Sequence, residues 1–260
     1  MHLTLEFPDL VRLIEERSNA FVALVAAAAD LEVPVPTCPG WTLFDLAQHV
    51  GQGRLRWAAI VAAGPADQRP TGTAPSDAVA APREQEAMHA WLAASVDELD
   101  TALRDAGPDR GCWTWWPDSQ SPQTAGAVAR HQVQEVAVHT HDAQLALGAP
   151  QPLPDEVALD GVEEFLSTCN ATTSPWPHPP AVLDYHATEG RSWRLLLSPE
   201  GARFSRLPAT EAAPEPADAS ARGSASELVL SMYGRIPPRS LEIEGDPRVL
   251  DRLVAWDPSA

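Results

Sequence analysis

Glu135 and His139 lie four residues apart in the segment HQVQEVAVHTHD, residues 131–142. On a helix this spacing puts the carboxylate and the imidazole on one face, with Cβ atoms about 5–6 Å apart. His49 lies far upstream, on a second predicted helix. Two ligands from one helix and a third from another is how helix bundles build metal sites in their cores. Two nitrogens and one oxygen suit zinc, and three protein ligands leave one coordination position open for chemistry.

Spacing alone leaves alternatives open at this site. His131 falls on the same helical face as Glu135 and His139 and is a rival ligand. The polar neighbours Gln132 and Gln134 also allow a simple solvated face, although a buried glutamate among valines and alanines would need a partner.

Two further residues have an ordinary structural interpretation as well. A histidine such as His49 on an apolar helix is most often a hydrogen-bonded core residue. Asp142, three residues after His139, either orients a ligand imidazole or is an ordinary residue near a helix C-terminus.

Other chemically interesting side chains point less clearly to a site. Three tryptophans, Trp113, Trp115 and Trp116, could line a substrate cleft, but loop packing onto the bundle explains them more simply. Cys38 has no base near it in sequence and is expected to be a buried turn residue. Arg235 follows a predicted helix, where a cation is favourable by itself.

Four amphipathic helices must position these residues. Apolar residues at helical spacing predict helices over about 8–30, 42–63, 83–106 and 124–147. Thr42 and Asp45 form a capping-box-like start for the helix that carries His49. Four such helices with joining loops predict a four-helix bundle over residues 1–150.

The periodicity changes in the last third of the chain. Residues 151–180 are expected to form one helix, at Asp155–Asn170, and a proline-rich linker. Residues 181–260 are expected to form a small α+β domain. Its predicted parts are strands at 183–187, 193–197 and 241–244, helices at 224–233 and from 247, and a mobile loop at 208–222. The predicted fold class is α+β.

Composition excludes several functions. The net charge of −18 argues against a nucleic-acid or anionic-membrane partner. All 18 basic residues are arginine, which excludes lysine Schiff-base chemistry. Three widely spaced cysteines favour neither a disulfide scaffold nor a cysteine zinc site. Without a signal-peptide pattern or a membrane-length apolar run, a cytoplasmic protein is expected, as a monomer or small homo-oligomer.

Three segments resemble a known family. Residues 35–50, VPTCPGWTLFDLAQHV, resemble the N-terminal signature of the mycothiol-dependent maleylpyruvate isomerase family, which belongs to the DinB-like helix-bundle metalloenzymes. Residues 131–143, HQVQEVAVHTHDA, resemble its fourth-helix motif. Residues 225–247, which include Gly234-Arg235, are similar to its sterol-carrier-like second domain.

The resemblance implies a divalent metal, typically Zn²⁺, held by His49, Glu135 and His139, with Arg235 in the active site. It implies a mycothiol-dependent isomerase or thiol S-transferase that acts on a small electrophilic substrate, expected to bear a carboxylate. Gln134 stands where the family usually has histidine, and His141 where it usually has tryptophan. These departures affect the expected substrate rather than the expected metal.

Two other functions remain open. The same site could support hydrolysis or isomerisation by metal-bound water without any thiol. The chain could also be a non-catalytic ligand-binding or regulatory module.

Overall fold

The computed structural model describes residues 5–208 and 216–257. The chain divides into two compact units. The first comprises Met1–Trp115 and Gln123–Leu153, and the second comprises Trp116–Pro122 and Pro154–Ala260. No helix within the described residues has both the length and the hydropathy needed to cross a bilayer.

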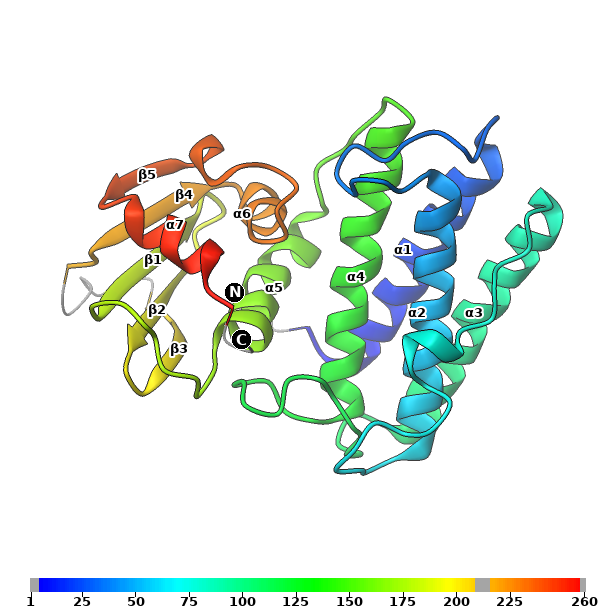
Figure 1. Cartoon of the computed structure of the whole chain (residues 1–260), viewed down its shortest axis with the longest axis horizontal. Helices are drawn as coiled ribbons and strands as arrows, with labels where there is room; N and C mark the ends of the chain where they lie inside the picture. The colour runs from blue at the N-terminus through cyan, green and yellow to red at the C-terminus, as the bar shows by residue number, and fades with distance from the viewer. Residues whose placement is uncertain (1–4, 209–215, 258–260) are drawn as a thin grey trace. The chain divides into compact units, whose positions relative to one another are not determined.

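The first unit is a bundle of four long helices (Figure 1). Helix α2 packs against α3, and α1 packs against α4. Each helix lies within a few residues of its predicted range, and the predicted helix bundle is confirmed. The bounds are α1 (Phe7–Ala27), α2 (Leu43–Ala63), α3 (Gln85–Ala106) and α4 (Ala125–Ala146), with a short 3₁₀ turn η1 (Pro75–Asp77) between α2 and α3.

Helix α2 begins at the predicted capping box. The Asp45 backbone N–H donates to Thr42 Oγ1 at 3.3 Å, and the Thr42 N–H donates to Asp45 Oδ2 at 2.9 Å. These bonds satisfy two backbone donors that the first helical turn would otherwise leave unpaired. The capping box therefore fixes the start of the helix and, with it, the face on which His49 lies.

Helix α4 buries polar residues as deeply as apolar ones. Gln134 is fully buried and Gln132 is 5% exposed, like the neighbouring Val133 and Val136. Gln132 and Gln134 are therefore not part of a solvated face, whereas 36% of the Glu135 side chain is exposed. Buried polar groups need partners, so the polar stripe of α4 must be satisfied by neighbouring elements or by ligands.

The second unit combines a five-stranded sheet with short helices (Figure 1), which confirms the predicted α+β class. The strand order is β3-β2-β1-β4-β5, and β1 pairs with β4 in parallel while the other pairs are antiparallel. The elements are α5 (Asp155–Phe165), the π-helical turn η2 (Leu166–Asn170), β1 (Ala181–Ala187), β2 (Ser192–Ser198), β3 (Gly201–Arg206), β4 (Ala219–Gly223), α6 (Ala225–Met232), η3 (Pro238–Ser240), β5 (Glu242–Gly245) and α7 (Arg248–Ala255).

Alternating apolar residues correctly predicted β1 and β2, and the strand predicted at 241–244 is β5, but the sequence interpretation missed β3 and β4. The loop expected at 208–222 is wrong at its C-terminal end, where residues 219–223 form β4, and residues 209–215 lie outside the described part. Ala219-Ser-Ala-Arg-Gly223 has few residues that favour strands. It forms a strand because it pairs on both sides, with β1 and with β5, where Ala219 and Ala221 are buried. Strand β3 was not predicted.

A buried ion pair links β1 to β2. Asp184 and Arg194 face each other in the antiparallel register. Arg194 Nε and Nη2 donate to Asp184 Oδ1 and Oδ2, each at 2.7 Å. The bidentate geometry satisfies both charged groups where water has little access.

Candidate metal centre

Helices α2 and α4 bring His49, Glu135 and His139 together. One nitrogen or oxygen atom from each side chain can be chosen so that all three lie within 4.8 Å of one another. His139 Nε2 lies 3.2 Å from Glu135 Oε2, and the rings of His49 and His139 have centroids 5.0 Å apart. Two ligands of a tetrahedral zinc ion lie about 3.4 Å apart, given bonds of about 2.0–2.2 Å. The three donors therefore fit a divalent ion after small movements, and we call them the metal triad.

A carboxylate on α4 orients the His139 ring from behind. His139 Nδ1 lies 2.9 Å from Asp142 Oδ2, and Asp142 is fully buried. Thr37 Oγ1 donates to Asp142 Oδ1 at 2.7 Å, and the Cys38 thiol lies 3.6 Å from Oδ2. The Asp142 carboxylate can accept a hydrogen bond from Nδ1–H, which leaves Nε2 facing Glu135, and histidine ligands are commonly oriented in this way.

The site favours positive charge between its carboxylates. Burial raises the pKa of Glu135, but the hydrogen bond from His139 and the charges of the nearby histidines outweigh burial and hold that pKa well below its usual range. Burial lowers the pKa of His139, but hydrogen bonds with Asp142, Cys38 and Glu135 outweigh it and hold that pKa well above its usual range. A divalent cation that displaced the proton on His139 would also stabilise these carboxylates, with one unit more of positive charge.

A cavity of about 30 Å³ lies beside the metal triad. That volume holds about one water-sized ligand. Its lining includes all three triad side chains together with Gly53, Arg54, Arg56 and Trp57 of α2, Gln132 of α4, and two valines. The cavity therefore has room for a small ligand next to the triad, and two arginines are part of its wall.

Arg54 is the most unusual residue of that wall. Its side chain is 2% exposed, and neither Nη1 nor Nη2 has a hydrogen-bond partner among the described residues. Its guanidinium carbon lies 6.0 Å from the centre of the Phe21 ring. Burial lowers the pKa of Arg54 to about 9, so the group stays charged at neutral pH.

The rival ligand and the loop residues occupy other positions. His131 lies edge-on to the rings of Trp57 and Trp115, with centroids 6.1 and 5.7 Å away, and no metal-binding group among the described residues includes it. Trp113 lies under the guanidinium of Arg69, at 4.5 Å. Trp116 is buried, as loop packing predicts, whereas 45% of Trp115 is exposed.

The sequence analysis did not predict that Cys38 contacts Asp142 or that Arg54 and Arg56 of α2 line the cavity. Cys38 lies in a turn, as expected, but it is half-buried instead of buried, and its thiol contacts Asp142, 104 positions away. No local pattern could have indicated that contact. For Arg56 a signal existed, because positions 49, 53 and 56 share one face of a helix.

The two departures from the family motif have different surroundings. Gln134 is fully buried, whereas the ring of His141 is half-buried and its Nδ1 lies 2.9 Å from the Gln151 carbonyl oxygen. Within the described residues, His141 belongs to no group of side chains that could hold a metal.

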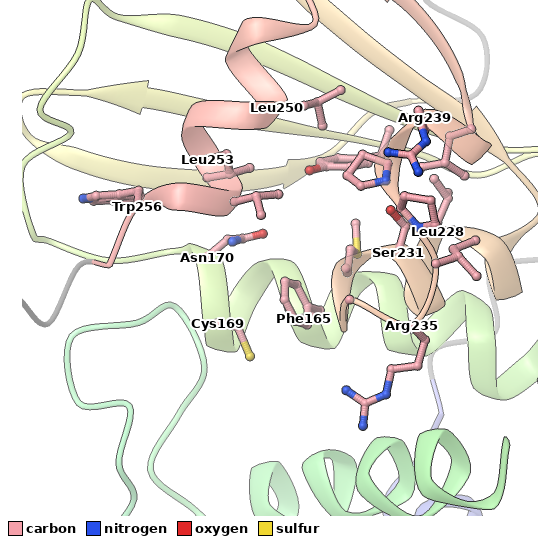
Figure 2. Close-up of a pocket in the computed structure, with 18 residues that line it drawn as sticks. Phe165, Cys169, Asn170, Leu228, Ser231, Arg235, Arg239, Leu250, Leu253 and Trp256 are labelled. Atoms are coloured by element: carbon pink, nitrogen blue, oxygen red, sulfur yellow. The ribbon is translucent and has the colours of Figure 1, made fainter. Parts of the chain in front are cut away.

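Arg235 belongs to the second unit. Its Nη1 donates to the Tyr233 carbonyl at 2.7 Å, and the residue lines a cavity of about 640 Å³ within that unit. Figure 2 shows its guanidinium at the edge of this cavity, turned away from Leu250 and Leu253. Arg235 and the metal triad therefore come from different units of the chain.

Two sequence profiles of one family match the chain in consecutive order. The profile described as mycothiol maleylpyruvate isomerase N-terminal domain matches residues 11–144, and the profile described as MDMPI C-terminal domain matches residues 156–252. No curated protein matches the chain.

Solved structures give the same overall fold. The chain superposes on crystal structures of the mycothiol-dependent maleylpyruvate isomerase and of a histidine-to-alanine mutant of it. Each has a TM-score of 0.57 and 16% sequence identity, and each alignment covers 92% of this chain and 93% of the other. At that identity the likeness is one of fold.

Proposed function

The chain belongs to the mycothiol maleylpyruvate isomerase family, a family of enzymes, and we propose that it is a zinc- and mycothiol-dependent isomerase or thiol S-transferase. Its substrate would be a small electrophile that bears a carboxylate. The observation that carries this proposal is the convergence of His49, Glu135 and His139 beside a small cavity. The donor set of two imidazoles and one carboxylate is that of a catalytic zinc site with one open position.

A divalent cation at the triad would lower the pKa of a bound thiol, so that a thiolate is available at neutral pH. The chain's own residues would prepare that position. Asp142 lies 2.9 Å from His139 Nδ1, so a proton kept at Nδ1 would leave Nε2 available as a ligand once the second ring proton is displaced. Buried side chains around α4 exclude bulk water and strengthen the electrostatic interactions at the site.

In an isomerase, the thiolate sulfur would add to one carbon of a cis double bond conjugated to a carbonyl. The electron pair of the double bond moves to the carbonyl oxygen, and the former double bond can rotate. Return of the electron pair breaks the C–S bond and releases the trans product and the thiolate, so no atoms are gained or lost. In a transferase, the adduct would instead take up a proton and keep the sulfur. An arginine, with Arg235 the candidate from family resemblance, would hold the substrate carboxylate.

The test measures maleylpyruvate isomerisation by the zinc-loaded protein, with and without mycothiol and with a chelator. We expect turnover to need both zinc and the thiol. We expect His139→Ala to lose bound zinc and turnover, because it removes a ligand. His89→Ala should keep both, because His89 is an exposed residue of α3.

Each negative result has a distinct meaning. Turnover that continues without thiol would support zinc-water chemistry and contradict the thiol mechanism. Full activity after complete zinc removal would overturn the metal-dependent proposal as a whole.

A further inference from the structure

Arg56 lies on the same face of α2 as His49. Positions 49, 53 and 56 are spaced by four and three residues, and all three line the cavity beside the metal triad. Seven residues of helix correspond to about 10 Å along the axis, a gap that a long arginine side chain can largely span.

The Arg56 side chain runs back over Gly53. Long side chains on helices lean toward the helix N-terminus, which on α2 is the direction of His49. A Cβ atom built on Gly53 would lie 4.0 Å from Arg56 Nη2. The guanidinium therefore lies over the glycine, and the missing side chain leaves open space between Arg56 and the metal triad.

The charge of Arg56 is not neutralised by a direct partner. Within the described residues, its guanidinium makes no hydrogen bond and no ion pair, and only the charges of Arg69 and Glu135 act on it. Burial and the nearby charge of Arg69 lower its pKa, while the carboxylate of Glu135 raises it. The Arg56 guanidinium is thus close enough to interact electrostatically with both Glu135 and Arg69. Arg54 is the second cation of the cavity wall, while Arg69 lies over the Trp113 ring and does not line the cavity.

A guanidinium held in this way is suited to a carboxylate. Its planar fork can donate two parallel hydrogen bonds to the two oxygens of one carboxylate. Once a metal ion engages Glu135, an anionic ligand is the counter-charge that the arginines still need. A chain with a net charge of −18 places two arginines in this cavity wall, and a third near Arg56, although acidic residues outnumber basic ones by 36 to 18.

We propose that Arg56, with Arg69 beside it, forms the carboxylate-binding subsite of the metal cavity and so selects substrates that carry a carboxylate next to the electrophilic carbon. The inference rests on the proposed function for the presence of the metal, but it assigns the carboxylate contact to Arg56 of the helix bundle instead of Arg235. Arg56 is a binding residue in this account. Arg69 is held over the Trp113 ring, and from there its positive charge repels the Arg56 guanidinium and so helps to position it.

The test is a binding measurement on zinc-loaded protein, with maleate as the anionic probe and uncharged maleamide as its control ligand. We expect Arg56→Gln to weaken maleate binding about 10–100-fold, the worth of hydrogen bonds to a charged group. We expect unchanged zinc content by elemental analysis and unchanged maleamide binding. Arg56→Lys keeps the positive charge but loses the planar guanidinium. Its affinity for maleate should therefore lie between those of Arg56→Gln and the parent protein. Arg104→Gln, on the exposed face of α3, should bind maleate like the parent protein.

Equal maleate affinity in Arg56→Gln and the parent protein would overturn the subsite, as would a parent protein that binds no maleate. Loss of zinc from Arg56→Gln would also overturn it, because Arg56 would then support the metal triad. The proposed function fails in a different way. It fails if the parent protein shows no thiol-dependent turnover, even where Arg56→Gln weakens maleate binding as expected.

Discussion

Asp142 fixes the orientation of His139 through a contact of 2.9 Å between Oδ2 and Nδ1. The two residues are three positions apart on α4, so the helix itself sets their geometry. Asp142 is in turn held by Thr37 and Cys38, from the turn before α2. One buried carboxylate thereby joins the ligand helix to the segment that leads into the helix of His49.

Asp142→Asn should weaken zinc binding about 10–100-fold, the usual cost of losing the group that orients a ligand histidine. The amide still accepts a hydrogen bond, but it lacks the charge that stabilises the Nδ1 proton. Competition with a chromophoric zinc chelator measures the dissociation constant. Asp97→Asn, at an exposed position of α3, is the matched control. If the dissociation constant is unchanged in Asp142→Asn, Asp142 does not orient a metal ligand and serves only to bind the turn at Thr37.

Zinc binding should strengthen as pH rises. His139 has a raised pKa in the folded protein, so its stabilising contribution to the metal-free protein is present below its usual pKa of 6.5 and is lost as pH rises through the raised value. The depressed pKa of Glu135 leaves that group ionised throughout this range. Zinc must displace the His139 proton, so its affinity increases about tenfold per pH unit below the raised pKa.

Thermal unfolding with and without zinc, from about pH 6 to about pH 8.5, checks this dependence. The increase in Tm caused by zinc should grow with pH in the parent protein. If the increase stays constant across that range, protonated His139 does not compete with the metal.

Arg54→Met should stabilise the protein by about 1–4 kcal/mol, since it replaces a buried charge whose terminal nitrogens have no hydrogen-bond partner among the described residues. Methionine fills a similar volume without the cost of burying a charge. Urea unfolding measures the free energy of unfolding. Arg104→Met, at an exposed site, should change it by no more than about 0.5 kcal/mol. A destabilised Arg54→Met variant would show that the guanidinium is satisfied in the folded protein.

Asp184→Ala should destabilise the second unit by about 3–5 kcal/mol, because it leaves the Arg194 guanidinium buried without its carboxylate. Replacing both residues, as Asp184→Leu with Arg194→Met, should recover most of that loss. Chemical unfolding of the three proteins provides the comparison. A single variant as stable as the parent protein would mean that water reaches the pair.

The helices could be predicted because their signals are local. Thr42 and Asp45 mark the start of α2 through bonds between residues three positions apart. The strands β1 and β2 could likewise be predicted, because apolar and polar residues alternate along them. Strand β4 could not be found in this way, since Ala219 and Ala221 favour a strand only when β1 and β5 lie on either side of them.

For the candidate site, the sequence determined that Glu135 and His139 share one turn of a helix, because helical periodicity is a property of neighbouring residues. Whether His131 or His139 would lie beside His49 depended on how α4 is rotated against α2. The tertiary structure alone decided that, just as it decided that Cys38 and Thr37 reach Asp142 and that Arg56 faces the cavity. Packing of apolar faces sets the rotation of one helix against another, and that packing involves residues distributed over the whole bundle.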